Sequence, residues 1–425
     1  MASETGGYAS DQPTALYLDA VVAYAFRGPA CFHVPGHKGG PGADPGVRKA
    51  IGVDGLVLSG GVPSFVTPEY DAERGITHCV TPAALEQALR EAPDAKAAFV
   101  VSPTYFGMAA DVAGLAQVAR AAGVPLVVDQ SWGPHFGFHD GLPSTALSQG
   151  ADAMLTSTHK IAGSLTQSAM LHVGDSDRID AGAIGRALRL LRSTSPSSLL
   201  IASLDGARRQ LALHGEQLLH ETLEAIDVAR AKLQTIEGIA LVDASLIGQM
   251  GVAGYDPLRI VLDVRGTGLT GYEIADALRR SYDVHVELPM QATVVFVVGI
   301  GESVATLRRV AGDVEETVKR LAEPGATAPI VPPQTSLRNE MALPPREAFL
   351  GVAEQVAVDA AVGRISCESI ASYPPGVPAL LPGERISAET VAYLRELAAA
   401  GARLHGASDP QFETINVLQE AEPTR

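Results

Sequence analysis

STHKIAGSLTQ, residues 157–167, places one lysine among small and polar residues, directly after the apolar segment Ala151 to Leu155. A lysine that only solubilises a surface is normally surrounded by other charges. Lys160 has Ser, Thr, His and Gly neighbours instead, which form hydrogen bonds and let a ligand approach closely. The stretch therefore predicts a chemical role for Lys160 after a buried strand, while an ordinary exposed lysine is the alternative.

A single carboxylate precedes this lysine by about 30 residues, the length of one βαβ unit. It is Asp129, which ends the short buried-strand pattern VPLVVD at residues 124–129. Pyridoxal 5'-phosphate (PLP) needs a lysine that forms a Schiff base and an acid that keeps the ring nitrogen protonated, so that the ring accepts electrons. The pair Lys160 and Asp129 suits such an enzyme, although an aspartate at the end of a strand often only caps the next helix.

Apolar strands alternate with helical patterns around these two residues. Lys96 to Ser102 and Leu126 to Asp129 have the composition of buried strands, and Asp111 to Ala122 has that of a helix. Thr81 and Pro82 are typical of an N-cap and a first helical position. This alternation predicts an α/β fold with a mostly parallel sheet and a site at the carboxyl ends of its strands.

Five segments, in the same order along the chain, resemble the bacterial ornithine/lysine/arginine decarboxylases, which are PLP enzymes of the aspartate aminotransferase fold (fold type I). The segments are FHVPGHKGG (32–40), VDQSWGPHF (128–136), STHKIAGSLTQSAMLHV (157–173), STSP (193–196) and YPPGVP (373–378). One of these matches alone is weak evidence, whereas five in order are specific. The resemblance implies a PLP-binding large domain, a smaller α+β domain and a C-terminal decarboxylase-family domain.

The resemblance also implies roles for particular residues. Lys160 and His159 are the expected catalytic residues, and Thr194 is expected to contact the cofactor phosphate of a neighbouring subunit, which implies a homodimer or a higher homo-oligomer. Trp132 is equally compatible with core packing, and the small polar residues with bonds to the backbone only. The residues expected to bind PLP are Lys160, Asp129, Ser131, Trp132, Ser157, His159 and Thr194.

The chain divides into five expected segments: an N-terminal arm with the HVPGHKGG loop (1–40), the large domain (41–235), a small α+β domain (236–323), a linker (324–339) and a C-terminal domain (340–425). The large domain is expected to be internally truncated after about residue 54. There ADPGVRKAIGVDG runs directly into LVLSG, where the family has a phosphate-binding turn and a histidine that stacks on the cofactor ring. About two βαβ-sized units are missing.

Local patterns within these segments give further expectations. Residues 1–13 are expected to form a flexible tail, Thr14 to Arg27 a helix, and FHVPGHKGG a loop. Residues 185–235 are expected to be helical. The small domain is expected to contain strands at residues 238–242, 259–264, 284–288 and 293–298 and a helix at residues 270–280.

Composition limits the possible classes. The net charge of −16 argues against a nucleic-acid partner, and three scattered cysteines argue against disulfides or zinc. The N-terminus lacks the features of a signal peptide, and no apolar run is long enough for a membrane helix. We therefore expect a cytoplasmic protein without a membrane partner.

Two other patterns resemble binding sites but are incomplete. His135 and His139 have the spacing of metal ligands, but no third ligand is evident. The glycine-rich run GTGLTG (266–271) resembles a dinucleotide loop, but it lacks the acidic residue at the required distance. We expect neither a metal site nor a nucleotide site.

The sequence thus predicts a PLP-dependent decarboxylase that converts lysine, ornithine or arginine to the corresponding amine and CO2, with Lys160 or His159 returning a proton to the α-carbon. Two alternatives remain. The missing phosphate turn and ring-stacking histidine favour a catalytically impaired or inactive member that keeps the scaffold. Another PLP reaction on the same fold, such as transamination, is the second alternative.

Overall fold

The computed structural model describes residues 8–10, 31–35, 50–191, 194–323, 339–373, 377–399 and 403–420. Within them no helix is long and apolar enough to cross a membrane. The helices are α2 (Ala50–Ser59), α3 (Pro82–Glu91), α4 (Val112–Ala121), α5 (Thr158–Ile161), α6 (Ala181–Leu191), α7 (Ser198–Leu233), α8 (Gly271–Tyr282), α9 (Val304–Leu321), α10 (Pro345–Leu350) and α11 (Ala388–Ala399).

The described strands form one seven-stranded sheet, one four-stranded sheet, one three-stranded sheet and three short pairs. They are β1 (Tyr8–Ser10), β2 (Cys31–Pro35), β3 (Val62–Val66), β4 (Tyr70–Asp71), β5 (Ile76–Thr77), β6 (Ala97–Val101), β7 (Met108–Ala110), β8 (Leu126–Asp129), β9 (Ala153–Thr156), β10 (Ala169–Val173), β11 (Ala240–Val242), β12 (Val252–Tyr255), β13 (Arg259–Asp263), β14 (Leu288–Pro289), β15 (Thr293–Val297), β16 (Ala353–Ala357), β17 (Ile370–Tyr373), β18 (Val377–Leu380), β19 (Arg403–His405) and β20 (Thr414–Leu418).

The large sheet has seven strands in the order β1-β10-β9-β8-β6-β2-β3. Strands β3, β2, β6, β8 and β9 run parallel, and β10 and β1 add antiparallel pairs at one edge. This is the mostly parallel sheet that the alternating pattern predicts. Because β8 and β9 are neighbours, their carboxyl ends lie side by side at the same edge.

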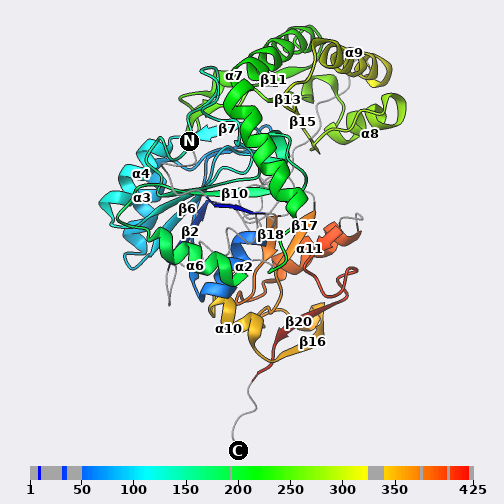
Figure 1. Ribbon diagram of the computed structural model, residues 1–425. Helices are drawn as coiled ribbons and strands as arrows, with labels where there is room; N and C mark the ends of the chain where they lie inside the picture. Colours follow the sequence, from blue (N-terminus) through cyan, green and yellow to red (C-terminus); the bar gives the residue numbers. More distant parts are fainter. Residues whose placement is uncertain are drawn as a thin grey trace, which may run out of the picture.

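Helices cover both faces of this sheet (Figure 1). Alternate residues of the central strands point to opposite sides: Ala98 and Val100 pack with α3 and α4, whereas Phe99 and Val101 pack with α6 and with Leu56 of α2. The strands are apolar throughout because both faces are buried. Thr81 caps α3 with its side chain, as the sequence predicts, and Asp111 caps α4 in the same way.

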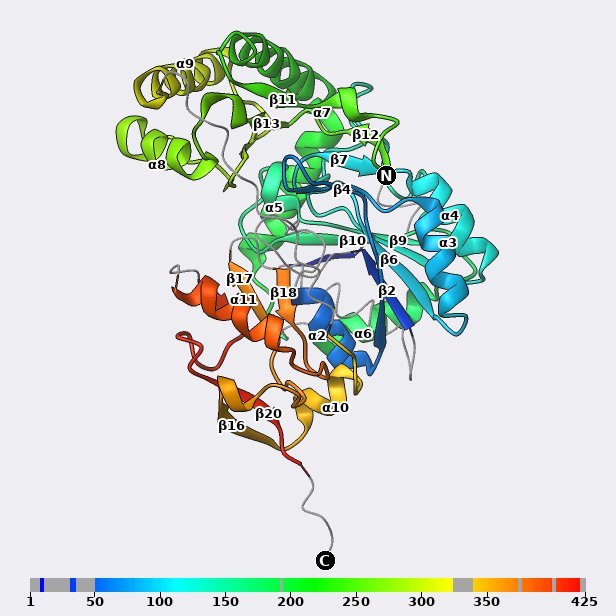
Figure 2. The same ribbon diagram turned by 180° about the vertical axis from the view of Figure 1, so that it is seen from behind.

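A second, antiparallel sheet has the order β11-β13-β15-β14 and packs with α7, α8 and α9 around its own apolar core. Both views show this unit at the opposite side of the large sheet from the C-terminal part, with the 36-residue helix α7 running between them (Figures 1 and 2). The run at residues 266–271 leads into α8, whose start has a capping box of Thr270 and Glu273.

The C-terminal part contains the β16–β20 pair, the sheet β18-β17-β19 and helices α10 and α11, with a separate apolar core. It contacts the large domain where α10 packs on α2 and the Arg346 guanidinium donates to the Leu58 carbonyl at 2.9 Å. The domain boundaries themselves stay a prediction from the sequence.

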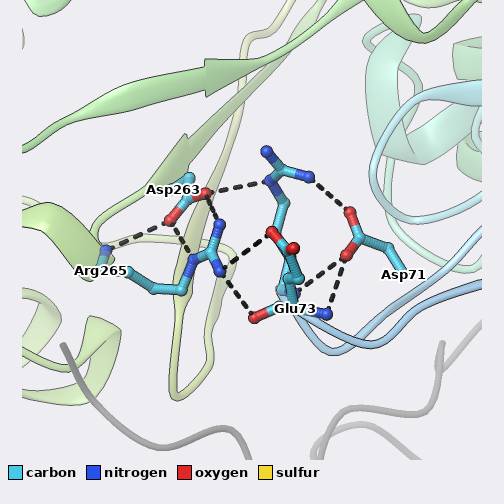
Figure 3. A network of polar contacts seen from close by, with 5 residues as sticks. Asp71, Glu73, Asp263 and Arg265 are labelled. Carbon is cyan, nitrogen blue, oxygen red and sulfur yellow. Dashed lines mark hydrogen bonds and ion pairs between the residues drawn. The ribbon is translucent and has the colours of Figure 1, made fainter.

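A cluster of charged residues connects the domain of the seven-stranded sheet with the domain of the four-stranded sheet (Figure 3). Asp263, at the end of β13, accepts hydrogen bonds from Arg74 of the β4–β5 hairpin and from Arg265. Arg74 also donates to Asp71 at 2.6 Å, and Arg265 donates to the Glu73 carbonyl. We call these five residues the interdomain clasp.

The structure corrects several local expectations. Residues 32–35 of the expected FHVPGHKGG loop belong to strand β2, and residues 8–10 of the expected tail pair with β10. The expected strand at 284–288 is present only as Leu288–Pro289, and the helical region 185–235 consists of two helices with a break between residues 191 and 198. The expected helix Thr14–Arg27, residues 36–49 and the linker at 324–338 lie outside the described residues.

Candidate active site

Asp129 and Lys160 lie at the same edge of the large sheet. Asp129 ends β8, and Lys160 follows β9 in the short helix α5. The two strands are parallel neighbours, with Asp129 paired to Leu155. The Asp129 side chain is buried, and its Oδ1 accepts a hydrogen bond from the Ser131 backbone at 2.9 Å. The sequence therefore identified two residues that the fold brings to one place.

Trp132 lies between these residues and the small domain. The Lys160 Nζ is 4.1 Å from the centroid of its indole, and Tyr105 contacts the ring edge-on at 5.0 Å between centroids. The buried Nε1 of Trp132 has no hydrogen-bond partner among the described residues. The hydroxyl of Tyr105 donates to the carboxylate of Glu287, which precedes β14.

The residues that flank Lys160 are held by the segment that follows it. The Nδ1 of His159 is 2.7 Å from the Ser168 carbonyl, and because a carbonyl oxygen only accepts, Nδ1 carries the proton. Nε2 is therefore the ring nitrogen that can accept one. Ser157 is fully buried at the N-cap of α5, and the neighbouring hydroxyl of Thr158 is buried with no hydrogen-bond partner in the described chain.

Thr194 is exposed in the turn between α6 and α7. None of the contacts found within the described part of the chain joins it to Asp129, Trp132 or Lys160. A contact from a neighbouring subunit, which the sequence suggests for Thr194, stays a prediction.

A group of buried charged residues lies beside Trp132, and the sequence patterns did not predict it. The guanidinium of Arg259 is 4.4 Å from the Trp132 centroid, and its NH1 is 3.7 Å from Asp256 Oδ2. Asp256 Oδ1 is in turn 2.9 Å from Nε2 of His135. Burial alone raises the pKa of Asp256, but its interactions with His135 and Arg259 outweigh burial and lower that pKa overall.

In the sequence, these buried charges are indicated only by Arg259, a charged residue at the start of the apolar run RIVLDV. His135, weighed as a metal ligand, is instead paired with Asp256, and His139 stacks on His220 with 5.8 Å between centroids. Within the described ranges, no group of three or more His, Cys, Asp or Glu residues is placed to hold a metal ion.

The residues at this edge fit PLP. Lys160 supplies an amine for the covalent link, and Asp129 supplies a buried carboxylate for the ring nitrogen. Three buried donors next to them, Trp132 Nε1, Ser131 Oγ and Thr158 Oγ1, have no hydrogen-bond partner within the described ranges. Buried donors are normally satisfied, so these three suit the oxygen atoms of a bound group.

Comparison with known families shows to which family the chain belongs. The family profile described as "Orn/Lys/Arg decarboxylase, major domain" matches residues 43–306, and the one described as "Orn/Lys/Arg decarboxylase, C-terminal domain" matches residues 334–413. The chain belongs to the Orn/Lys/Arg decarboxylase family. This family is PLP-dependent and decarboxylates basic amino acids.

Two relatives within the decarboxylase family are named arginine decarboxylases. The one from Bacillus subtilis is 37% identical over 377 residues, which cover 88% of this chain and 76% of the relative. The one from Halalkalibacterium halodurans is 32% identical over 487 residues, which cover 96% of this chain and 98% of the relative. An alignment of that length exceeds the 425 residues of this chain, so this decarboxylase lacks tens of positions of the relative. The position of the missing residues, expected after about residue 54, stays a prediction from the sequence.

Solved structures confirm the fold class. A lysine decarboxylase from Francisella novicida, LdcF, superposes with a TM-score of 0.75 at 18% identity, over 97% of this chain and 70% of that one. The ureidoglycine-glyoxylate aminotransferase of Bacillus subtilis superposes with a TM-score of 0.56 over 75% of this chain. At such low identity the likeness concerns the fold alone.

Proposed function

We propose that this decarboxylase acts on arginine and holds PLP through Lys160 and Asp129. The observation that carries the proposal is the position of these residues at the carboxyl ends of neighbouring parallel strands, β8 and β9. The choice of arginine over lysine or ornithine rests on the two relatives named arginine decarboxylases, which match most of the chain.

When bound, PLP supplies an electron sink for the electrons released with CO2. The carboxylate of Asp129, buried and held by the Ser131 backbone, keeps a proton at the ring nitrogen. Ser131, Trp132, Ser157 and Thr158 provide hydroxyl and indole donors to the cofactor. Lys160 and His159 are the groups that return a proton to the α-carbon, and the bond from His159 Nδ1 to the Ser168 carbonyl fixes the orientation of the imidazole.

Titration of purified protein with PLP tests the cofactor site. We expect visible absorbance from PLP linked to the protein, and its loss in Lys160→Ala. Lys319→Ala is the matched control, because Lys319 is an exposed lysine of α9 that pairs with Glu315. Absorbance that persists in Lys160→Ala contradicts the assignment of the lysine.

Release of CO2 from arginine, lysine and ornithine, measured in parallel, tests the substrate. We expect the highest kcat/KM with arginine. Preference for lysine or ornithine rejects the choice of arginine but not the reaction, and no CO2 from any of the three by a PLP-loaded protein rejects decarboxylation.

A second candidate follows from the missing positions. Charge-assisted hydrogen bonds to phosphate contribute about 1.5–3 kcal/mol each, and the family's phosphate turn falls in the segment that this chain lacks. A family member that keeps the scaffold without turnover is therefore the competing proposal. Folded protein that stays colourless with excess PLP supports it.

We also propose that the active unit is a homodimer in which Thr194 contacts the partner subunit's cofactor phosphate. Two exposed apolar side chains, Leu190 and Leu199, lie on either side of Thr194 in the sequence. They are compatible with a subunit interface. Sedimentation analysis tests the oligomeric state. The cytoplasmic location remains a prediction from the sequence.

A further inference from the structure

Arg259 is a fully buried cation beside the candidate active site. Its side chain has no exposure, and its three guanidinium nitrogens have no hydrogen-bond partner among the residues that the structure describes. Its NH1 is 3.7 Å from Asp256 Oδ2, which is close enough for an ion pair but beyond hydrogen-bond distance. The guanidinium instead lies over the indole of Trp132, 4.4 Å from its centroid.

The surroundings hold Arg259 in this position. Asp256 is itself fixed by His135 Nε2 at 2.9 Å, by the Leu258 backbone at 3.0 Å and by its own backbone bond to the Gly107 carbonyl at 2.7 Å. Gly107 lets the aliphatic part of Arg259 pack closely, because a Cβ there would lie 2.9 Å from the Arg259 Cβ and Cγ. The arginine is thus locked from several directions.

Stability alone does not account for a buried charge of this kind. Removing a guanidinium and a carboxylate from water is costly, and well-packed apolar residues of similar volume are often as stable or more so. Arg259 has one interaction that an apolar residue cannot replace. A cation over an indole face is attracted by the ring quadrupole, most strongly when both groups are desolvated.

Trp132 links Arg259 to the lysine of the candidate active site. Its ring also receives the Lys160 Nζ at 4.1 Å, so one indole contacts two cationic side chains. Arg259 begins β13 of the small sheet, Trp132 follows β8 of the large sheet, and Lys160 follows β9. The position of the indole therefore depends on both domains.

We propose that Arg259 is a positioning residue, whose guanidinium, held by Asp256 and His135, fixes the indole of Trp132 against Lys160. It touches neither the cofactor nor the substrate and acts through Trp132. This inference rests on the proposed function in one respect: the lysine positioned in this way is the one that holds PLP.

The chain contains its own probe for this arrangement, because Trp132 is its only tryptophan. In the near-ultraviolet circular dichroism spectrum of the protein without PLP, the tryptophan band therefore comes from Trp132 and reports how well its indole is ordered. In Arg259→Met we expect the tryptophan band to be lost and the indole to become more accessible to acrylamide. Because the displaced indole no longer positions Lys160, we also expect PLP to bind roughly ten-fold more weakly. A change of this size corresponds to the loss of one desolvated cation–π contact.

Three further variants make the test decisive. Asp256→Asn/Arg259→Met removes both partners of the Arg259–Asp256 ion pair together and keeps an acceptor for His135, so it serves if Arg259→Met does not fold. Arg259→Lys keeps the cation and is expected to restore part of the band and of the PLP affinity. Arg279→Met, at an exposed arginine of α8 that pairs with Asp276, is the control and is expected to keep both the band and the PLP affinity.

An unchanged tryptophan band in the charge-free double variant overturns the proposal, as does a lost band with unchanged PLP affinity. If the unaltered protein binds no PLP, the proposed function fails on its own. The circular dichroism of the cofactor-free variants then still decides whether Arg259 orders Trp132.

Discussion

The interdomain clasp predicts the effect of Asp263→Asn, a change that removes a charge and keeps the size of the side chain. Asp263 receives four hydrogen bonds: Arg265 donates through Nε at 2.9 Å, NH2 at 2.8 Å and its backbone at 3.2 Å, and Arg74 donates through Nε at 3.0 Å. The asparagine amide cannot accept the same set and places an N–H group against arginine donors.

The magnitude follows from the burial of the partners. The Asp263 side chain is 7% exposed, whereas those of Arg74 and Arg265 are 28% and 24% exposed. A charge-assisted hydrogen bond contributes about 1.5–3 kcal/mol, but solvent around the two arginines screens part of this, so we expect a total loss of about 2–3 kcal/mol. Burial raises the pKa of Asp263, but the Arg265 hydrogen bonds outweigh it and lower that pKa overall. The stabilisation is therefore present above the ordinary carboxyl pKa and is lost as the pH falls through the lowered one.

Hydrogen exchange of the β4–β5 hairpin measures this local effect directly. Its amides include those of Glu73 and Arg74, bonded to Asp71 Oδ1, and that of Gly75, bonded to the Asp71 carbonyl. A loss of about 2–3 kcal/mol corresponds to exchange that is roughly 30- to 150-fold faster in peptides from this region.

Glu86→Gln is the matched control for Asp263→Asn. Glu86 pairs with Arg90 at 3.0 Å on the surface of α3, with side chains that are 57% and 65% exposed. Such a pair contributes at most about 0.5 kcal/mol, so its loss leaves hairpin exchange almost unchanged. Equal exchange in Asp263→Asn and Glu86→Gln refutes the view that the clasp stabilises the hairpin.

Three more predictions concern stability. Burial lowers the pKa of His78 to about 4 from 6.5, so the unfolded chain binds the proton first, and stability falls as the pH drops from 6.5 to 4. Denaturation measured between pH 7 and 4 should show that His78→Phe loses up to roughly 3 kcal/mol less stability over this range than the unaltered protein. Gly107→Ala, at φ +84° against Arg259, should lower Tm more than Gly123→Ala, which carries similar backbone strain at φ +72° in open space; equal shifts would exclude the clash. Thr270→Ala breaks the capping box of α8 and should cost about 1 kcal/mol in urea denaturation.

The sequence was sufficient to predict a strand or helix wherever the local residue pattern and the burial of the segment agree. The strands that end at Val101 and Asp129 are apolar on both faces, and the helices after Thr81 and Asp111 have side-chain caps, so each is specified by its own residues. The pair of Asp129 and Lys160 could be anticipated because neighbouring parallel strands end at the same edge.

The remaining elements depend on distant partners. The segments at β1 and β2 have loop-like or tail-like sequences and become strands only by adding to β10, β3 and β6. The contact between Trp132 and Arg259 joins residues from two domains, and no local spacing predicts it. Residues 284–288 have a strand-like composition, but only Leu288 pairs with β15.

Strand β2 bears on how a shortened chain keeps an unbroken framework. It runs parallel to β3 on one side and to β6 on the other. Without β2, β3 would have no partner in this sheet, and one side of β6 would leave its peptide groups unsatisfied. Residues 31–35 therefore keep β3 in the sheet and cover the open side of β6, so the N-terminal segment of a shortened chain completes the framework.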